Sequence, residues 1–187
     1  LNSIIEELQE KNIVLVGECI GASIAMKYVS RYPGKVSKLV LICGSPKFMA
    51  TNDFPCGHPQ NEVNKHFALL EESYNRWLRA FLELIFPEPG TEYLKEWGFK
   101  MSQKTTKEIA GNSLRNLFDA DLRPLLGKIS TPTLILHGKH DGAAPWEGAK
   151  YMHENIPGSK MYIFKESGHF PSITAADKFN RILKEFI

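Results

Sequence analysis

The sequence predicts an α/β fold, in which helices cover both faces of a parallel sheet and one helical insertion interrupts the core. Short aliphatic runs, typical of strands buried on both faces, alternate along the chain with helical segments of ten or more residues. A helical stretch rich in aromatic residues separates the first strands from the last ones. Because alternating strands and helices pack as a parallel sheet between helical layers, these observations define the fold class.

The first part of the core, residues 1–47, contains two predicted strands. The elements expected are a helix at 1–8, a strand at 13–16, a helix at 20–31 and a strand at 38–43. Both strands are continuous runs of β-branched and aliphatic residues. The Pro33-Gly34 pair ends the second helix, because proline cannot continue a helix.

Residues 48–120 are predicted to form a helical cap with an apolar inner surface. From Val63 to Ile85 the apolar side chains keep a helical period without a break, and further helices are expected at 93–101 and 106–118. More than half of the aromatic residues of the chain lie in this segment. Such a concentration favours a pocket for a medium acyl chain or an aromatic ring.

The second part of the core, residues 121–187, returns to alternating strands and helices. The elements expected are strands at 133–137 and 160–164, a helix at 145–155 and a final helix near the C-terminus. Thr174 and Asp177, three residues apart, predict a capping box at the start of that final helix.

The composition suits one folded domain that binds a small partner without strong charge. The 187 residues are 43% hydrophobic and 24% charged, and the formal net charge is +2. No long basic run is present, which argues against nucleic acid or an acidic membrane as partner. No apolar run approaches the ~20 residues that a membrane-spanning helix needs.

The three cysteines, Cys19, Cys43 and Cys56, are expected to be free thiols. Their number is odd, and a chain of this size needs no disulfide framework to fold. Free thiols persist in reducing compartments, so we expect a cytoplasmic protein. Cys43 ends a strand and is expected in the core, whereas Cys56 belongs to a loop.

The segment Gly17-Glu18-Cys19-Ile20-Gly21 connects the first strand to the next helix in the pattern of a nucleophile elbow, with cysteine in the place of serine. A sharp strand-to-helix turn strains its central residue and brings backbone segments close together. Small residues are therefore expected two positions to either side. The positive end of the helix dipole favours a thiolate at Cys19, and the amide of Ile20 points toward a developing oxyanion.

Candidate acid and base residues follow the elbow in chain order. Asp141 and His169 each lie just past the end of a predicted strand. A nucleophile, then an acid, then a histidine, each at the carboxyl end of a parallel strand, is the arrangement of a catalytic triad. The loop after the strand that ends at Cys43 offers no carboxylate, which leaves Asp141 as the candidate acid.

The sequence resembles the α/β-hydrolase superfamily, and within it the esterases and carbon–carbon hydrolases that carry a helical cap. The resemblance rests on the elbow, the order of the candidate triad, Asp121-Leu122-Arg123-Pro124 before the strand at 133–137, and Ser167-Gly168-His169-Phe170-Pro171. It implies Cys19 as nucleophile, His169 as general base and then acid, and Asp141 as the group that orients the imidazole. It also implies the backbone amide of Ile20 as an oxyanion donor.

The aromatic cap predicts a substrate pocket, and the chain offers no sign of a cofactor. The candidate pocket residues are Phe67, Trp77, Phe81, Trp97, Phe99 and Phe170. His137 and His140 flank Asp141, but no carboxylate or cysteine cluster has the spacing of metal ligands, so no metal is expected. The other histidines, His58, His66 and His153, are expected to have ordinary structural roles. No phosphate-binding glycine motif occurs, and we expect no cofactor.

One departure from the family pattern leaves the reaction open. Most members have serine where this chain has Cys19; dienelactone hydrolases and polyhydroxyalkanoate synthases carry the Gly-x-Cys-x-Gly form, and an engineered change of Ser to Cys would look the same. The cysteine favours hydrolysis of a carboxylic ester or thioester through a covalent acyl-enzyme. The alternatives are an acyltransferase with the same triad and a non-catalytic small-ligand receptor on the same fold.

The second departure is that the strands which precede the elbow in the family are absent, together with the loop that supplies a second oxyanion donor. The strand at 13–16 is therefore expected at an edge of the sheet, with an apolar row and unpaired backbone groups. We expect a companion N-terminal segment or chain to complete the sheet.

Overall fold

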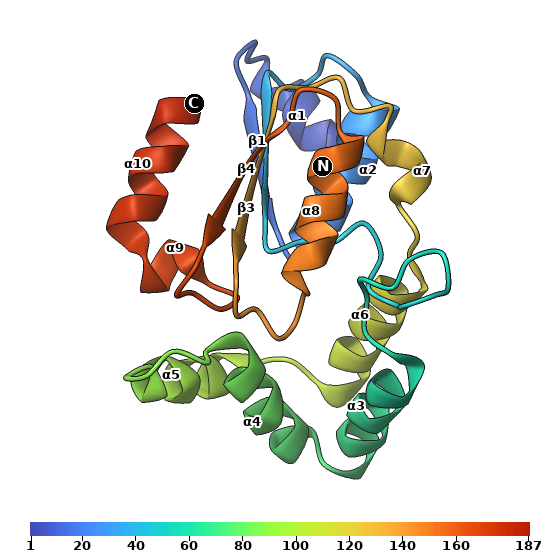
Figure 1. The fold of residues 1–187 in the computed structure, drawn as a ribbon, viewed down its shortest axis with the longest axis vertical. Coiled ribbons are helices and arrows are strands. Elements are labelled where there is room, and N and C mark those ends of the chain that lie inside the picture. Colours follow the sequence, from blue (N-terminus) through green and yellow to red (C-terminus); the bar gives the residue numbers. More distant parts are fainter.

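A computed structural model describes residues 1–187 and contains one parallel four-stranded sheet flanked by helices (Figure 1). The strands are β1 (Val14–Glu18), β2 (Lys38–Ile42), β3 (Thr133–Gly138) and β4 (Lys160–Phe164), in the order β1-β2-β3-β4. The helices of the core are α1 (Asn2–Leu8), α2 (Ile20–Arg31), α7 (Arg123–Leu126), α8 (Trp146–Asn155), α9 (Pro171–Thr174) and α10 (Ala176–Phe186). The predicted α/β class with a parallel sheet is confirmed.

The two faces of the sheet are covered by different helices, and the alternation of side chains along β2 shows how. Leu39 and Leu41 belong to a buried cluster with residues of α2, α7 and α8. Val40 and Ile42 belong to a second cluster that includes Phe179 of α10. Figure 1 shows α10 on one side of the sheet and α2 and α8 on the other. A central strand buried on both faces explains the continuous aliphatic run of its sequence.

The first strand differs from β2 because it lies at an edge of the sheet, as predicted. Val14 and Leu15 are only half-buried, and Val16 is 49% exposed. The expectation that this strand is buried on both faces is therefore wrong. Its aliphatic sequence resembles that of a central strand, but β1 pairs with a neighbour on one side only.

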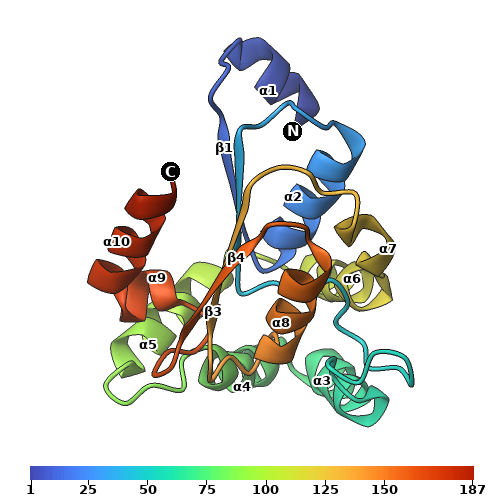
Figure 2. The same ribbon diagram turned by 45° about the horizontal axis from the view of Figure 1, so that its top comes forward.

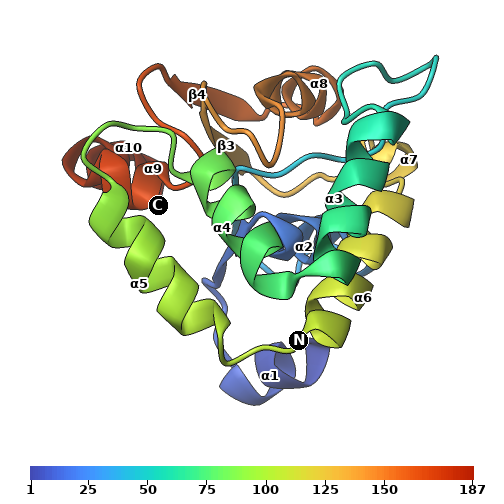
Figure 3. The same ribbon diagram turned by 90° about the horizontal axis from the view of Figure 1, so that it is seen from below.

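Four helices of the insertion lie across the carboxyl ends of the strands, and we refer to them as the cap (Figure 1). They are α3 (Gln60–Glu72), α4 (Tyr74–Ile85), α5 (Glu92–Ser102) and α6 (Lys107–Asp119). Seen from below in Figure 3, α4 lies between α3 and α5, and α6 packs beside α3. In Figure 2 the cap and α1 occupy opposite ends of the molecule. The edge of the sheet formed by the carboxyl ends of the strands is thus covered by the cap.

Two local predictions are wrong. The single helix expected from Val63 to Ile85 is broken at Ser73, whose extended backbone ends α3 and whose hydroxyl accepts a hydrogen bond from the Arg76 amide at the start of α4. The expected capping box fails because Thr174 ends α9, where its hydroxyl donates to the Phe170 carbonyl. No helix combines the length and the apolar character needed to cross a bilayer.

Candidate active site

The predicted elbow forms a sharp turn between β1 and α2. Cys19 has φ 53° and ψ −114°, which is the left-handed half of the backbone map and is unfavourable for a residue with a side chain. The Cys19 amide donates to the Ile42 carbonyl at 2.9 Å, which holds the turn against the neighbouring strand. The strained conformation places the thiol at the carboxyl end of the sheet, where the cap covers it.

The two glycines of the elbow have different roles. A Cβ at Gly17 would lie 2.3 Å from the Gly21 carbonyl oxygen and 2.8 Å from the Ala22 nitrogen, so no larger residue fits there. A Cβ at Gly21 would meet nothing within 4 Å. The expectation that both positions must be small is therefore confirmed for Gly17 and wrong for Gly21. Gly17 approaches the backbone of Gly21, but a side chain at Gly21 would point into open space.

The candidate acid is held by four hydrogen-bond donors. Asp141 Oδ2 accepts from His169 Nδ1 at 2.7 Å, and Oδ1 accepts from the amides of Ala143 and Ala144 at 2.9 and 3.0 Å. The fourth donor is His137, whose Nε2 lies 3.2 Å from Oδ2 and also donates to the Ala144 carbonyl at 2.8 Å. A carboxylate with this many donors is fixed in position and in its ionised form.

The hydrogen bond between Asp141 and His169 shifts both groups toward their charged forms. Burial raises the pKa of Asp141, but the hydrogen bonds from His137 and His169 outweigh this effect and hold the pKa well below its ordinary value. Burial lowers the pKa of His169, but the Asp141 hydrogen bond and the nearby Cys19 sulfur raise it to about 10. The geometry therefore favours an imidazolium at neutral pH.

The third predicted residue, Cys19, lies next to this pair. Its sulfur is close enough to His169 to raise the pKa of the imidazole. His169 Nδ1 is taken by Asp141, which leaves Nε2 for the sulfur. Ile20 is the first residue of α2, where a backbone N–H has no acceptor within the helix. The structure thus brings Cys19, Asp141, His169 and the amide of Ile20 together.

The C-terminal end of α4 is hydrogen-bonded to the loops that carry Asp141 and His169. The Leu84 carbonyl accepts from the Gly142 amide at 3.2 Å, and the Ile85 carbonyl accepts from the His169 amide at 3.1 Å. Beyond the helix, Glu88 Oε1 accepts from the Gly168 amide at 2.6 Å. The cap is therefore hydrogen-bonded directly to the segments that carry the candidate acid and the candidate base.

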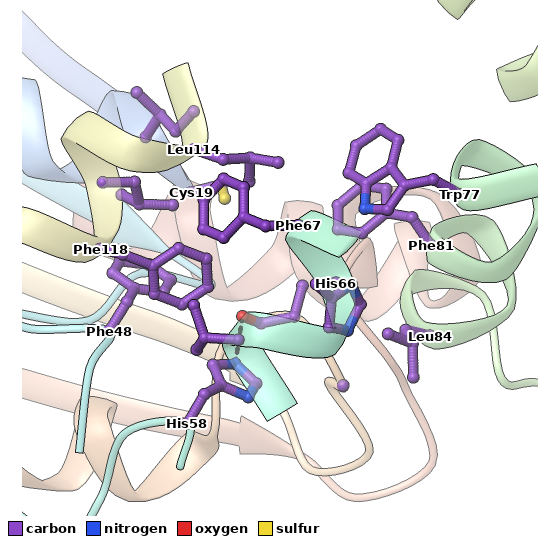
Figure 4. Close-up of a pocket in the computed structure, with 15 residues that line it drawn as sticks. Cys19, Phe48, His58, His66, Phe67, Trp77, Phe81, Leu84, Leu114 and Phe118 are labelled. Carbon is purple, nitrogen blue, oxygen red and sulfur yellow. Dashed lines mark hydrogen bonds between the residues drawn. The ribbon is translucent and has the colours of Figure 1, made fainter. Parts of the chain in front are cut away.

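A cavity of about 90 Å³ opens between Cys19 and the cap (Figure 4). The residues around it are Cys19, Ile20, Phe48, His58, Val63, His66, Phe67, Trp77, Phe81, Leu84, Leu114, Leu117, Phe118, Gly142 and Ala143. Three of the six predicted pocket residues, Phe67, Trp77 and Phe81, are among them. The lining is mostly apolar, as expected for a site that receives an acyl group.

The other three predicted pocket residues do not line this cavity. Trp97 is 56% exposed, and the guanidinium of Arg79 lies 4.0 Å from the ring centre of Phe99. Phe170 stacks on Phe86 with ring centres 5.1 Å apart. A helical period identifies an apolar face but does not say whether that face lines a cavity or packs against a neighbour.

Sequence reasoning missed two histidines of the cavity. His58 Nε2 donates to the Ala143 carbonyl at 2.9 Å, whereas the half-buried ring of His66 makes no hydrogen bond to the protein. His66 follows Val63 by three residues and precedes Phe67, so it shares the inner face of α3. The three-residue spacing from Val63 could therefore have identified His66 as a residue of the cavity.

One group of side chains has the composition of a metal site. The ligand atoms of Cys43, His137 and Asp141 lie within 4.8 Å of one another, and all three residues are buried. Both carboxylate oxygens of Asp141 are already taken by protein donors. Burial, and then Asp141, raises the pKa of the Cys43 thiol well above its ordinary value, which favours the protonated form. These properties fit a hydrogen-bonded acid rather than a metal ligand.

Known proteins resemble this chain along nearly its full length. Residues 1–176 match the family described as alpha/beta hydrolase fold. The AB hydrolase superfamily protein YisY of Bacillus subtilis is 29% identical over 100% of this chain and 70% of its own. A strigolactone esterase of Arabidopsis thaliana is 27% identical over 98% of this chain and 69% of its own. The structure of an esterase from Exiguobacterium antarcticum matches with a TM-score of 0.92 at 34% identity, over 99% of this chain and 70% of that one.

Proposed function

The chain belongs to the α/β-hydrolase fold family and groups with its esterase-type hydrolases, and we propose that it cleaves carboxylic esters or thioesters through a covalent intermediate on Cys19. His169 transfers the protons, and Asp141 orients and charges the imidazole. Residues 48–120 act as the cap over the acyl group. The observation that carries this proposal is the 2.7 Å hydrogen bond from His169 to the buried Asp141, with Cys19 beside the imidazole in a strained turn.

In the proposed reaction, the Cys19 thiolate attacks the carbonyl carbon of the substrate and a carbon–sulfur bond forms. The negative charge moves to the carbonyl oxygen, which accepts a hydrogen bond from the Ile20 amide. The intermediate then collapses, the bond to the leaving group breaks, and the His169 imidazolium protonates the departing alcohol or thiol.

Water completes the proposed cycle. Neutral His169 takes a proton from the water, the resulting hydroxide attacks the acyl carbon, and the carbon–sulfur bond breaks. The products are a carboxylic acid, the Cys19 thiolate and the His169 imidazolium, which begin the next cycle. In an acyltransferase, an alcohol or amine would take the place of this water, whereas a receptor would stop before or at the acyl-enzyme.

The exposed edge of β1 supports a further part of the proposal, a companion polypeptide segment that pairs with this strand. Val16 presents an apolar side chain at that edge, and an unpaired edge of this kind favours association. Cys19, Cys43 and Cys56 are all free thiols. Because free thiols suit a reducing compartment, we propose the cytoplasm as the location.

The proposal is tested by the hydrolysis of p-nitrophenyl acetate. We expect turnover by the wild type and a loss of at least about 10³-fold in kcat/KM for Cys19→Ala, because the nucleophile is removed. Cys56→Ala serves as the matched control, since this thiol lies in a loop outside the cavity, and it should keep wild-type activity. Full activity of a folded Cys19→Ala variant would contradict the proposed mechanism.

A further inference from the structure

Trp77, a residue that lines the cavity, carries a hydrogen-bond donor that has no partner in the protein. The side chain of Trp77 is 5% exposed, and its indole N–H donates to no protein atom. Its ring stacks with Phe81 at 5.3 Å and with Tyr74 at 5.9 Å between ring centres, which fixes the plane of the indole. Nearly all buried polar groups in proteins are paired, so this orphaned donor points to a partner that comes from outside the chain.

A second polar side chain lies among the apolar residues of the same cavity. His66 lines the cavity from α3 and makes no hydrogen bond to the protein (Figure 4). Burial lowers the pKa of His66, and the neighbouring His58 lowers it further, so the ring is neutral at pH 7. A neutral imidazole offers one N–H and one lone pair. It is therefore a second group that is free to bind a polar atom of a ligand.

The chemistry of the indole decides what the ligand must supply. A tryptophan N–H can donate but cannot accept, so its partner must be an acceptor such as a carbonyl or ether oxygen. The remaining side chains are largely apolar and favour a hydrocarbon chain around that oxygen. At about 90 Å³, the cavity is smaller than the ~150 Å³ that holds a benzene molecule, which favours a short acyl chain.

We propose that the preferred substrates are esters of short acids that carry a second carbonyl oxygen in the acyl chain, and that Trp77 binds this oxygen with the help of His66. This inference rests on the proposed function and names its substrate class. Without that oxygen, the indole donor stays unpaired in the complex, as it is in the free protein. A matched alkyl ester is therefore a poorer substrate.

The test compares two esters of nearly equal shape, p-nitrophenyl 4-oxopentanoate and p-nitrophenyl pentanoate. We expect the wild type to prefer the oxo ester by about tenfold in kcat/KM, the effect of one well-formed hydrogen bond. Trp77→Phe keeps an aromatic ring but removes the donor, and it should hydrolyse the two esters at rates within about twofold of each other. Trp97→Phe removes the exposed tryptophan outside the cavity and should keep the wild-type preference.

The outcomes separate this inference from the proposed function. Equal kcat/KM values of the wild type for the two esters would overturn the inference and leave the hydrolase intact, and this result does not depend on the folding of any variant. A tenfold preference that persists in folded Trp77→Phe would overturn the role of the indole. If the wild type hydrolyses neither these esters nor p-nitrophenyl acetate, the proposed function itself fails.

Discussion

The two walls of the cavity differ in how their polar groups are satisfied. On the side of the sheet, both oxygens of Asp141 accept hydrogen bonds, and His169 is held by its side chain and by its backbone amide. On the side of the cap, the Trp77 indole and the His66 imidazole have no partner within the chain. The first wall is complete before any ligand arrives, whereas the second is not.

In the proposed mechanism, the first wall carries out the chemistry and the second wall selects the substrate. Groups that transfer protons must be in place before the reaction, because their reorganisation would add to the barrier. Groups that recognise a substrate can remain unpaired until it binds, and the cost of leaving them unpaired then disfavours the wrong substrate. Changes on the sheet side should therefore reduce the turnover of all esters, while changes at Trp77 should alter the choice among them.

After the loss of the nucleophile itself, the largest effect is expected from Asp141→Asn. The variant loses the charge that orients and stabilises the His169 imidazolium, so kcat/KM should fall about 10³-fold for every ester. Asp119→Asn is the matched control, because Asp119 is exposed and outside the cavity. Retention of wild-type kcat/KM by a folded Asp141→Asn variant would show that this carboxylate is not the acid of a triad.

The same substitution changes how the protein responds to pH. In the wild type the pKa of His169 is raised to about 10. The ion pair of His169 with Asp141 therefore stabilises the fold fully at pH values below about 6.5, the ordinary pKa of histidine, and this contribution is lost as the pH rises through 10. Asp141→Asn removes the hydrogen bond to a carboxylate that raises the pKa of His169, so burial lowers this pKa. Nuclear magnetic resonance titration of the His169 ring measures both values. A His169 ring that is neutral at pH 7 in the wild type would contradict this account.

An intermediate effect on stability is expected from Gly17→Ala. The added Cβ meets the backbone of Gly21 and Ala22, which cannot move without opening the elbow, and the free energy of unfolding should fall by about 3 kcal/mol. Gly21→Ala is the control, since its Cβ meets nothing and alanine suits a helix better than glycine, so unfolding should change by less than about 1 kcal/mol. Equal losses in denaturant titrations of the two variants would argue against the close approach at Gly17.

The smallest effect is expected at Glu88. This residue follows α4 of the cap and accepts a hydrogen bond from the Gly168 amide, next to His169. Glu88→Ala removes the acceptor for the buried Gly168 amide, and the free energy of unfolding should fall by about 1 kcal/mol. Glu88→Gln keeps an acceptor oxygen and should retain most of this stability. If the alanine and glutamine variants unfold at the same denaturant concentration, the bond from Glu88 to the histidine loop contributes nothing measurable.

The sheet side of the site could be predicted from the sequence, and the cap side could not. Cys19, Asp141 and His169 each follow a strand, and parallel strands bring their carboxyl ends to one edge, so order along the chain is enough to place them together. No comparable rule places the residues of the cap relative to the cavity. Its aromatic residues share a helical period, but tertiary packing decides that Trp77 lines the cavity and Trp97 faces solvent. The break between α3 and α4 at Ser73 could not be predicted either, because the apolar periodicity of the sequence continues across it.

The central claim, that Cys19 forms a covalent acyl intermediate, is tested most directly by intact-mass spectrometry after brief exposure to p-nitrophenyl acetate, with the adduct located by peptide digestion. We predict one acetyl group on Cys19 that disappears as hydrolysis proceeds and is absent from Cys19→Ala. Turnover of the ester without any acetyl group on Cys19, or with a transient acetyl group on Cys56 in its place, would contradict the account.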